Sequence, residues 1–300
     1  MTVPPLSPLP ATEAISDRYR DLDAWASEAV LDALWEGQLA AVATVRPALP
    51  ALAAAAEAAV PLLARGGRLV YCGAGTSGRI GVQDGAELPP TFDWPQDRLV
   101  LLMAGGDAAF TRSIENAEDD REAGIRRIGE HSVGVDDVVL GIAASGSTPF
   151  TAACLEEAGR RGALTIGIAN SPGGAVLAAA THRILVETGA EAVAGSTRMK
   201  AGTAQKVVLN LFSTLVMVRL GRVYQGTMVD MLARNEKLRL RAIRMLRHLT
   251  GCDETAARAT LDHTGGRVKP AVLVVRGLDV KAADEALRRH GGSLRAALAE

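Results

Sequence analysis

Cysteine is scarce in this 300-residue chain, which contains only Cys72, Cys154 and Cys252, far apart and without a Cys-x-x-Cys pair. This spacing indicates neither a disulfide framework nor a zinc site. The five histidines also lack the spacing of metal ligands. We therefore expect a protein that holds no metal and that suits a reducing cytoplasm.

A secretion signal and an excess of one charge are also missing. Residues 1–10 are rich in proline and lack the basic segment and apolar core of a signal peptide. No apolar run looks long enough to span a bilayer. The 33 basic side chains nearly balance 34 acidic ones, which leaves no long-range field to recruit nucleic acid or an anionic membrane. We expect a cytoplasmic protein without nucleic-acid or membrane partners.

Short β-rich runs alternate with helical ones from Arg68 onward, and this alternation predicts a parallel sheet. The runs are 68–72, 98–104, 137–144, 163–169 and 182–187. Because they are apolar on both faces, we expect helices on both sides of a five-stranded sheet, in a three-layer doubly wound α/β domain. Ligands bind such sheets at the carboxyl ends of the strands.

Helical patterns flank the predicted sheet. Ala-rich stretches at 22–45 and 51–64 precede it, and an apolar helix over 199–220 follows it. The composition of this last helix suits either the core or a subunit interface, and we favour the interface. Two Gly-Gly turns, in 265–272 and 291–298, each enter an amphipathic helix and predict a small helical carboxyl-terminal domain. The resulting division is a helical segment (1–64), a sheet domain (65–230) and a helical domain (231–300).

Two glycine- and hydroxyl-rich loops follow the first and third predicted strands. Residues 73–79 match the Gly-x-Gly-x-x-Gly dinucleotide fingerprint. In a dinucleotide site an acidic residue at the end of the second strand binds the ribose, but Asp107 already lies beyond that strand, so the fingerprint is incomplete. The loop at 144–149 is comparable, and Pro149 suits the first position of a helix. Small residues, hydroxyls and positive helix ends are typical of a phosphomonoester site.

A third cluster at 195–203 adds two cations, Arg198 and Lys200, to further hydroxyls at the start of the long helix. Serine and threonine also cap helices, so one such loop alone would favour capping. Three loops at successive strand ends favour a site for a phosphorylated ligand.

Three long segments carry a resemblance to a known family. They are GAGTSGRIGVQDGAELPPTF (73–92), AGGDAAFTRSIENAEDD (104–120) and ETGAEAVAGSTRMKAGTAQKVVLN (187–210). The loops look like those of sugar isomerase (SIS) domains, and the segments resemble the N-acetylmuramic acid 6-phosphate etherase family. The resemblance implies an SIS-type fold, a phosphorylated amino sugar as ligand, no cofactor and, by analogy, a homodimer.

The resemblance also implies which residues hold the substrate. Ser145, Ser147 and Thr148 would bind the phosphate, with a contribution from Ser77. The family commonly has arginine where this chain has Ser147, so a guanidinium near the ligand is missing here. With the other loops, the substrate-binding candidates are Thr76, Ser77, Ser145, Ser147, Thr148, Glu191, Ser196 and Lys200.

Two glutamates that the family uses in catalysis correspond to Glu87 and Glu118. The implied reaction is elimination of the lactyl group from the open-chain sugar, followed by addition of water. It yields N-acetylglucosamine 6-phosphate and D-lactate, in the recycling of cell-wall sugars. One carboxyl group would act as base and the other as acid, and the sequence does not assign the two roles.

Two other functions remain open: a non-catalytic phosphosugar-sensing regulator and a sugar-phosphate isomerase. The absence of a recognisable helix-turn-helix segment and the presence of both Glu87 and Glu118 count against the sensor. The long motif centred on Glu87 counts against the isomerase.

Overall fold

The structure, a computed structural model, describes residues 10–231 and 235–300 and forms two compact units. The first contains the chain up to Gly85 together with Asp97–Phe212, and the second contains Ala86–Gln96 and Ser213–Glu300. The domain boundaries that we place at residues 64 and 230 from the sequence stay predictions.

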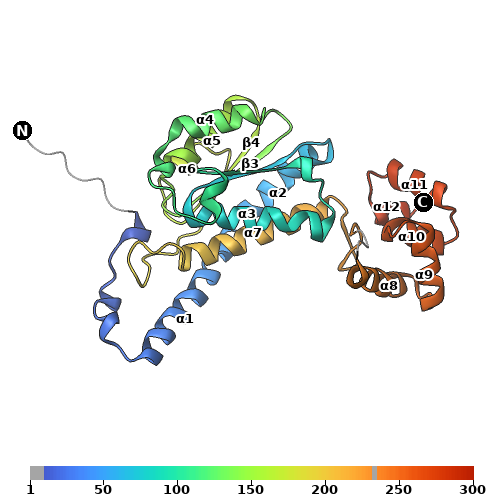
Figure 1. The fold of residues 1–300 in the computed structure, drawn as a ribbon, viewed down its shortest axis with the longest axis horizontal. Helices are drawn as coiled ribbons and strands as arrows, with labels where there is room; N and C mark the ends of the chain where they lie inside the picture. Colours follow the sequence, from blue (N-terminus) through green and yellow to red (C-terminus); the bar gives the residue numbers. More distant parts are fainter. Residues whose placement is uncertain (1–9, 232–234) are drawn as a thin grey trace, which may run out of the picture. The chain divides into compact units, whose positions relative to one another are not determined.

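The first unit is built on five parallel strands in the order β2-β1-β3-β4-β5 (Figure 1). They are β1 (Leu69–Gly73), β2 (Leu99–Met103), β3 (Val138–Ala143), β4 (Leu164–Ala169) and β5 (His182–Leu185). The strand order reverses at β1, so the carboxyl ends of β1 and β3 form the switch point at which such sheets bind ligands. All five predicted strands are confirmed.

Helices cover both faces of the sheet, which confirms the three-layer doubly wound α/β fold. In Figure 1, α4, α5 and α6 lie on one side of the strands and α2, α3 and α7 on the other. Their bounds are α2 (Leu49–Ala64), α3 (Gly75–Phe92), α4 (Arg121–Glu130), α5 (Pro149–Arg160), α6 (Ala175–Ala178) and α7 (Lys200–Arg219).

Glycines bring α3 unusually close to the sheet. A Cβ atom built on Gly78 would lie 2.7 Å from the Gly73 carbonyl oxygen, and one on Gly81 would lie 2.8 Å from Ile142 Cδ1. One on Gly85 would lie 2.8 Å from Leu101 Cδ2. A larger residue would require the backbone to shift at Gly78 and the neighbouring side chains to shift at Gly81 and Gly85, so these glycines permit the close approach of α3 to the sheet.

A polar cluster joins β1, α3 and α7, and its members Tyr71 and Asp84 are buried. The Tyr71 hydroxyl donates to Asp84 Oδ2 at 3.0 Å, and Asn210 Nδ2 donates to Asp84 Oδ1 at 2.6 Å. Burial, reinforced by the charge of Asp84, raises the pKa of Tyr71 well above its ordinary value. The phenol therefore remains a hydrogen-bond donor to the carboxylate.

Helix α1 runs over Ser27–Ala43, shorter than the predicted 22–45 because Leu22–Ala24 forms a separate 3-10 turn. Contrary to the expectation from the sequence, Ser27–Ala64 and Lys200–Arg219 are each long and apolar enough to cross a membrane. Core helices of soluble proteins pass the same test. Helix α7 belongs to the core, because Ala204, Val208 and Phe212 on it are fully buried.

The second unit is mostly helical and confirms the predicted carboxyl-terminal helices. A hairpin of β6 (Val223–Tyr224) and β7 (Thr227–Met228) precedes α8 (Glu236–Thr250), α9 (Glu254–His263), α10 (Val268–Val275), α11 (Val280–Arg289) and α12 (Leu294–Ala297). All four glycines of the two Gly-Gly turns have positive φ angles, which explains their residue type. Each turn leads into a helix, α10 or α12, whose apolar side chains join one buried cluster.

Candidate active site

The first two loops of the candidate site lie at the switch point of the sheet. Helix α3 begins at Gly75 directly after β1, and α5 begins at Pro149 after the β3 loop. Because β1 pairs with β3, with Gly73 opposite Ile142, the two helix amino termini come to the same edge. Unpaired amides of the first turns and the helix dipoles make this edge attractive to an anion.

Hydroxyls of the β3 loop are available to a ligand. Within the described residues, the Thr148 hydroxyl makes no capping bond although Thr148 is the N-cap of α5. Ser147 is exposed, whereas Ser145 is half-buried and its hydroxyl accepts the Ser147 amide at 3.2 Å. Capping, the ordinary role of such residues, therefore does not account for Thr148.

The same loop packs closely against the start of α6. The Gly146 carbonyl accepts from the Val176 amide at 2.9 Å, and Gly146 has a φ of +73°. A Cβ atom built on Gly174 would lie 2.2 Å from the Gly146 oxygen. This close backbone packing fixes the geometry of the loop before any ligand arrives.

The third cluster starts α7 and lies beside the first loop. A Cβ atom built on Gly202 would lie 3.5 Å from Thr76 Cγ2. The buried Glu191 carboxylate accepts the backbone amides of Lys200 and Ala201, at 2.9 and 3.0 Å, so it caps α7. Lys200 Nζ donates to the Ala190 carbonyl at 2.9 Å.

These contacts give Glu191 and Lys200 structural partners within the protein. Ser196 is half-buried just before α7, and Ser77 is buried in the first turn of α3. A substrate contact of Glu191, Ser196 or Lys200 stays a prediction.

Glu118 lies on the segment that follows β2. This segment contains 3-10 turns at Asp107–Phe110 and Ala117–Asp119 before Asp120 caps α4 by accepting the Ala123 amide at 2.8 Å. Glu118 is exposed and helps to line a cavity of about 190 Å³ with Ala74 and Gly75 of the first loop. The structure therefore brings Glu118 to the loop that follows β1.

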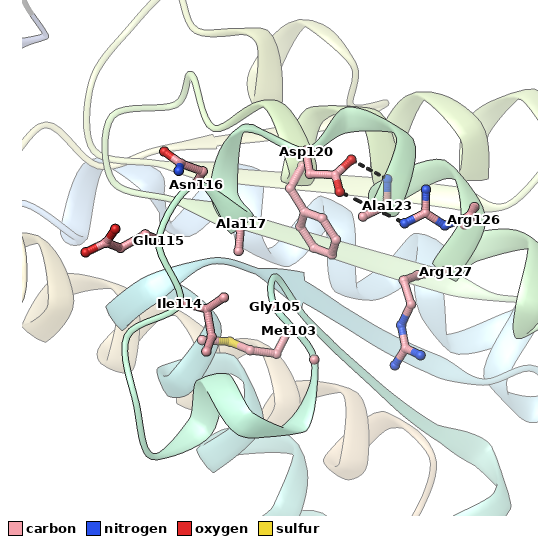
Figure 2. Close-up of a pocket in the computed structure, with 12 residues that line it drawn as sticks. Met103, Gly105, Ile114, Glu115, Asn116, Ala117, Asp120, Ala123, Arg126 and Arg127 are labelled. Atoms are coloured by element: carbon pink, nitrogen blue, oxygen red, sulfur yellow. Dashed lines mark hydrogen bonds and ion pairs between the residues drawn. The ribbon is translucent and has the colours of Figure 1, made fainter.

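A neighbouring cavity of about 520 Å³ shares Met103 and residues 114–117 with the first (Figure 2). Two arginines of α4 line it, Arg126 near Asp120 at 4.0 Å and Arg127, whose buried Nε has no partner among the described residues. Figure 2 shows Glu115 directed away from these arginines. The cavity next to Glu118 thus has a basic wall.

Arg79 anchors the segment that leads to Glu118. Its Nε donates to the carbonyl oxygens of Ala109 and Phe110 at 3.1 and 3.2 Å, and its Nη2 donates to the Arg112 carbonyl at 3.0 Å. Sequence reasoning missed this role, although Arg79 stands inside the first family-like segment. A planar guanidinium presents five N–H donors in a rigid fork, which lets one side chain bind several carbonyls of this segment.

Glu87 lies on α3 in the second unit and is exposed, with Pro89 and Pro90 immediately after it in the same helix. Glu118 belongs to the first unit. That both carboxyl groups act on one substrate therefore stays a prediction. Within residues 10–231 and 235–300, no group of three or more His, Cys, Asp and Glu side chains could hold a metal ion.

Comparisons with known proteins agree with this architecture. The SIS domain model matches residues 130–215, and the glucokinase regulatory protein N-terminal SIS domain model matches residues 51–159. A phosphoheptose isomerase from Francisella tularensis aligns with a TM-score of 0.50 over 65% of this chain and 100% of its own, at 21% identity, a likeness that shows the fold. Fold and loops define an SIS-domain protein.

Relatives that align with most of the chain identify the family within this class. N-acetylmuramic acid 6-phosphate etherase from Deinococcus radiodurans is 49% identical over 96% of this chain and 95% of its own. The etherase from Halalkalibacterium halodurans is 43% identical over 96% and 97%, and that from Symbiobacterium thermophilum 51% identical over 77% of each. This chain belongs to the N-acetylmuramic acid 6-phosphate etherase family.

Proposed function

We propose that this chain is a carbon–oxygen lyase that cleaves the lactyl ether of N-acetylmuramic acid 6-phosphate. The observation that carries the proposal is 49% identity to an etherase over 96% of the chain. The hydroxyl-rich loops at the switch point support a phosphorylated ligand independently, since Ser147 and Thr148 stand beside the amino terminus of α5. Products are N-acetylglucosamine 6-phosphate and D-lactate.

The substrate phosphate binds between the first two loops, at Ser77, Ser145, Ser147 and Thr148. In the open-chain sugar, the hydrogen on the carbon next to the aldehyde is acidic, so a carboxylate removes it as a proton. The bond from the neighbouring carbon to the lactyl oxygen then breaks, and that oxygen takes a proton from an acid. Water adds to the double bond, its hydroxyl at the carbon that lactate left and its hydrogen at the other.

Glu87 and Glu118 are our candidates for the base and the acid. Both side chains are exposed, so a substrate can reach them. Glu118 also shares a cavity with Gly75 of the first loop, the loop that leads into the α3 helix on which Glu87 lies. No cofactor is needed for this proton transfer chemistry, because the aldehyde itself acidifies the neighbouring hydrogen.

The other two functions have weaker support. The model named for the glucokinase regulatory protein matches residues 51–159, which leaves out the carboxyl-terminal helices that the etherases share with this chain. The likeness to the phosphoheptose isomerase stands at 21% identity and concerns the fold alone. Etherase activity is therefore the function that these comparisons support best.

Release of D-lactate tests this function. Purified protein without added metal or nucleotide should release one D-lactate for each N-acetylmuramic acid 6-phosphate consumed, measured with a coupled lactate assay. The unphosphorylated sugar, at the same concentration, should react far more slowly because the loops lose their anion. Tight binding of the phosphosugar without lactate release would instead favour the sensor.

We further propose that the protein is a cytoplasmic homodimer and that α1 contributes to its interface. Leu31, Trp35, Leu39 and Val42 follow one another at helical spacing on α1 and are 65%, 62%, 52% and 46% exposed. An apolar stripe of this kind on a helix is typical of a protein contact, and a second copy of the chain would cover it.

Sedimentation at micromolar concentration should therefore give twice the chain mass. Trp35→Glu should shift the equilibrium toward the monomer because it places a charge in the apolar stripe. Glu36→Gln, a change of the adjacent side chain on the same helix, is the control and should leave the mass unchanged. A wild-type protein that sediments as a monomer would rule out this part of the proposal.

A further inference from the structure

The turn of α3 that carries Glu87 is intrinsically weak. Pro89 and Pro90 lie inside the helix and cannot donate helical hydrogen bonds, since proline has no amide hydrogen. The direction of this turn must then depend on what holds the helix end beyond it. Leu88, beside Glu87, is buried at 2% exposure and gives the turn one apolar anchor.

The end of α3 is closed by its own backbone. Asp93 has a φ of +51°, and its amide donates to the Pro89 carbonyl at 3.0 Å. The Trp94 amide then donates to the Leu88 carbonyl at 3.4 Å. This left-handed ending is a common helix stop, but an aspartate adopts it at a cost that glycine does not have.

Arg222, in the segment after α7, binds this end of α3 by hydrogen bonds. Its Nη1 donates to the carbonyl oxygens of Phe92 and Asp93 at 2.6 and 3.1 Å. Its guanidinium carbon lies 5.2 Å from the centroid of the Trp94 ring, which is buried. One side chain thus binds the last carbonyls of α3 and stacks on the residue that follows them.

The two Gly-Gly repeats, residues 265–272 and 291–298, are linked to Arg222 through Asp230. Asp230 Oδ2 lies 3.8 Å from Arg222 Nη1 and accepts from Lys269 Nζ at 2.7 Å. Lys269 Nζ also donates to the Gly292 carbonyl at 2.6 Å, so it links the first repeat to the second. Burial lowers the pKa of Lys269 against the opposing effect of Asp230, in keeping with an ammonium group enclosed by the protein.

We infer that Arg222 is a positioning residue for Glu87, and that the Gly-Gly repeat domain holds it in place through Lys269 and Asp230. This inference rests on the proposed function, because it takes Glu87 as a catalytic residue. It assigns a role to the repeats, which the sequence leaves unexplained. The repeats fix the end of the helix whose weakest turn carries the carboxylate.

Arg222→Lys tests the inference, because lysine keeps the charge but loses the planar guanidinium, whose Nη1 binds both carbonyls while the group lies over the Trp94 ring. We expect kcat for lactate release to fall about 10- to 100-fold, the effect of a small misplacement of a catalytic group. The dissociation constant of N-acetylglucosamine 6-phosphate should stay within about twofold of wild type, since phosphate binding does not involve the end of α3.

Arg267→Lys is the matched control. Arg267 belongs to the same unit and also binds both a carboxylate and a carbonyl, those of Asp284 and Thr264, without a hydrogen bond to the end of α3. Both variants should show similar shifts in thermal unfolding, whereas only Arg222→Lys should lose turnover. An equal loss of turnover in both would show a general structural effect and would overturn the inference.

Two further measurements separate the inference from the proposed function. Amide hydrogen exchange at residues 86–94 should accelerate in Arg222→Lys relative to the control, whether or not lactate is released, and unchanged exchange would overturn the inference. In a Glu87→Gln background, Arg222→Lys should lower the residual turnover by less than about twofold, because a residue acting through Glu87 has nothing left to position. A full additional loss there would also overturn it.

Discussion

Glu87→Gln should lower kcat for lactate release by about 10² to 10⁴, the usual contribution of a positioned general acid or base. The amide has nearly the same shape as the carboxyl group but neither accepts nor supplies the proton at the carbon next to the aldehyde or at the lactyl oxygen. Because Glu87 is exposed on α3, its replacement leaves no buried group unpaired. Steady-state kinetics with a lactate assay measure the effect.

The binding of N-acetylglucosamine 6-phosphate separates a catalytic from a structural loss in this variant. Its dissociation constant should change little, and thermal unfolding should match the wild type. Glu236→Gln, an exposed glutamate in the same unit, serves as the control and should retain full turnover. Unchanged turnover in Glu87→Gln would remove Glu87 from the catalytic pair.

The sheet is the part of the fold that the sequence predicted best. Its strands are buried on both faces, so each reads as a continuous apolar run, as in 138–143, where every residue is buried. Helix ends were less accurate. The predicted helix over 22–45 begins at Ser27 in the structure, because the pattern of apolar residues does not distinguish a 3-10 turn from the helix that follows it.

The loops show where sequence reasoning about the site stops. The alternation of elements predicts a parallel sheet, in which all strands end at one edge, but it does not give the strand order; the pairing of β1 with β3 comes from the structure. The partners of long side chains do not follow from the alternation either. Glu191 caps α7 across nine residues, and Arg79 reaches carbonyls some thirty residues away, at Ala109 and Phe110.

Arg222 was missed for a related reason. Its proposed role depends on hydrogen bonds to the carbonyls of Phe92 and Asp93, more than a hundred residues earlier in the chain. A single sequence carries no signal for contacts between residues so far apart. The Gly-Gly repeats are visible as a sequence pattern, but their link to Arg222 depends on the side chain of Lys269. An amphipathic pattern identifies Lys269 as a cation and does not predict which carboxylate it binds.

Turnover should be as sensitive to replacement of Glu118 as to replacement of Glu87. We expect Glu118→Gln to lower kcat by about 10² to 10⁴. Its backbone is well defined on both sides, by the Arg79 bonds before it and by the Asp120 cap of α4 after it. The matched control is Glu115→Gln, because Glu115 is exposed and lines the same cavity as Glu118. That variant should keep nearly all its turnover.

Isotope exchange then assigns the two roles. A variant that lacks the base should no longer exchange the hydrogen next to the aldehyde with deuterated water, whereas one that lacks only the acid should still exchange it. If Glu118→Gln releases lactate at the wild-type rate, or if Glu115→Gln loses as much turnover, Glu118 has no specific part in the chemistry. Loss of exchange in one variant and its retention in the other would divide base and acid between Glu87 and Glu118.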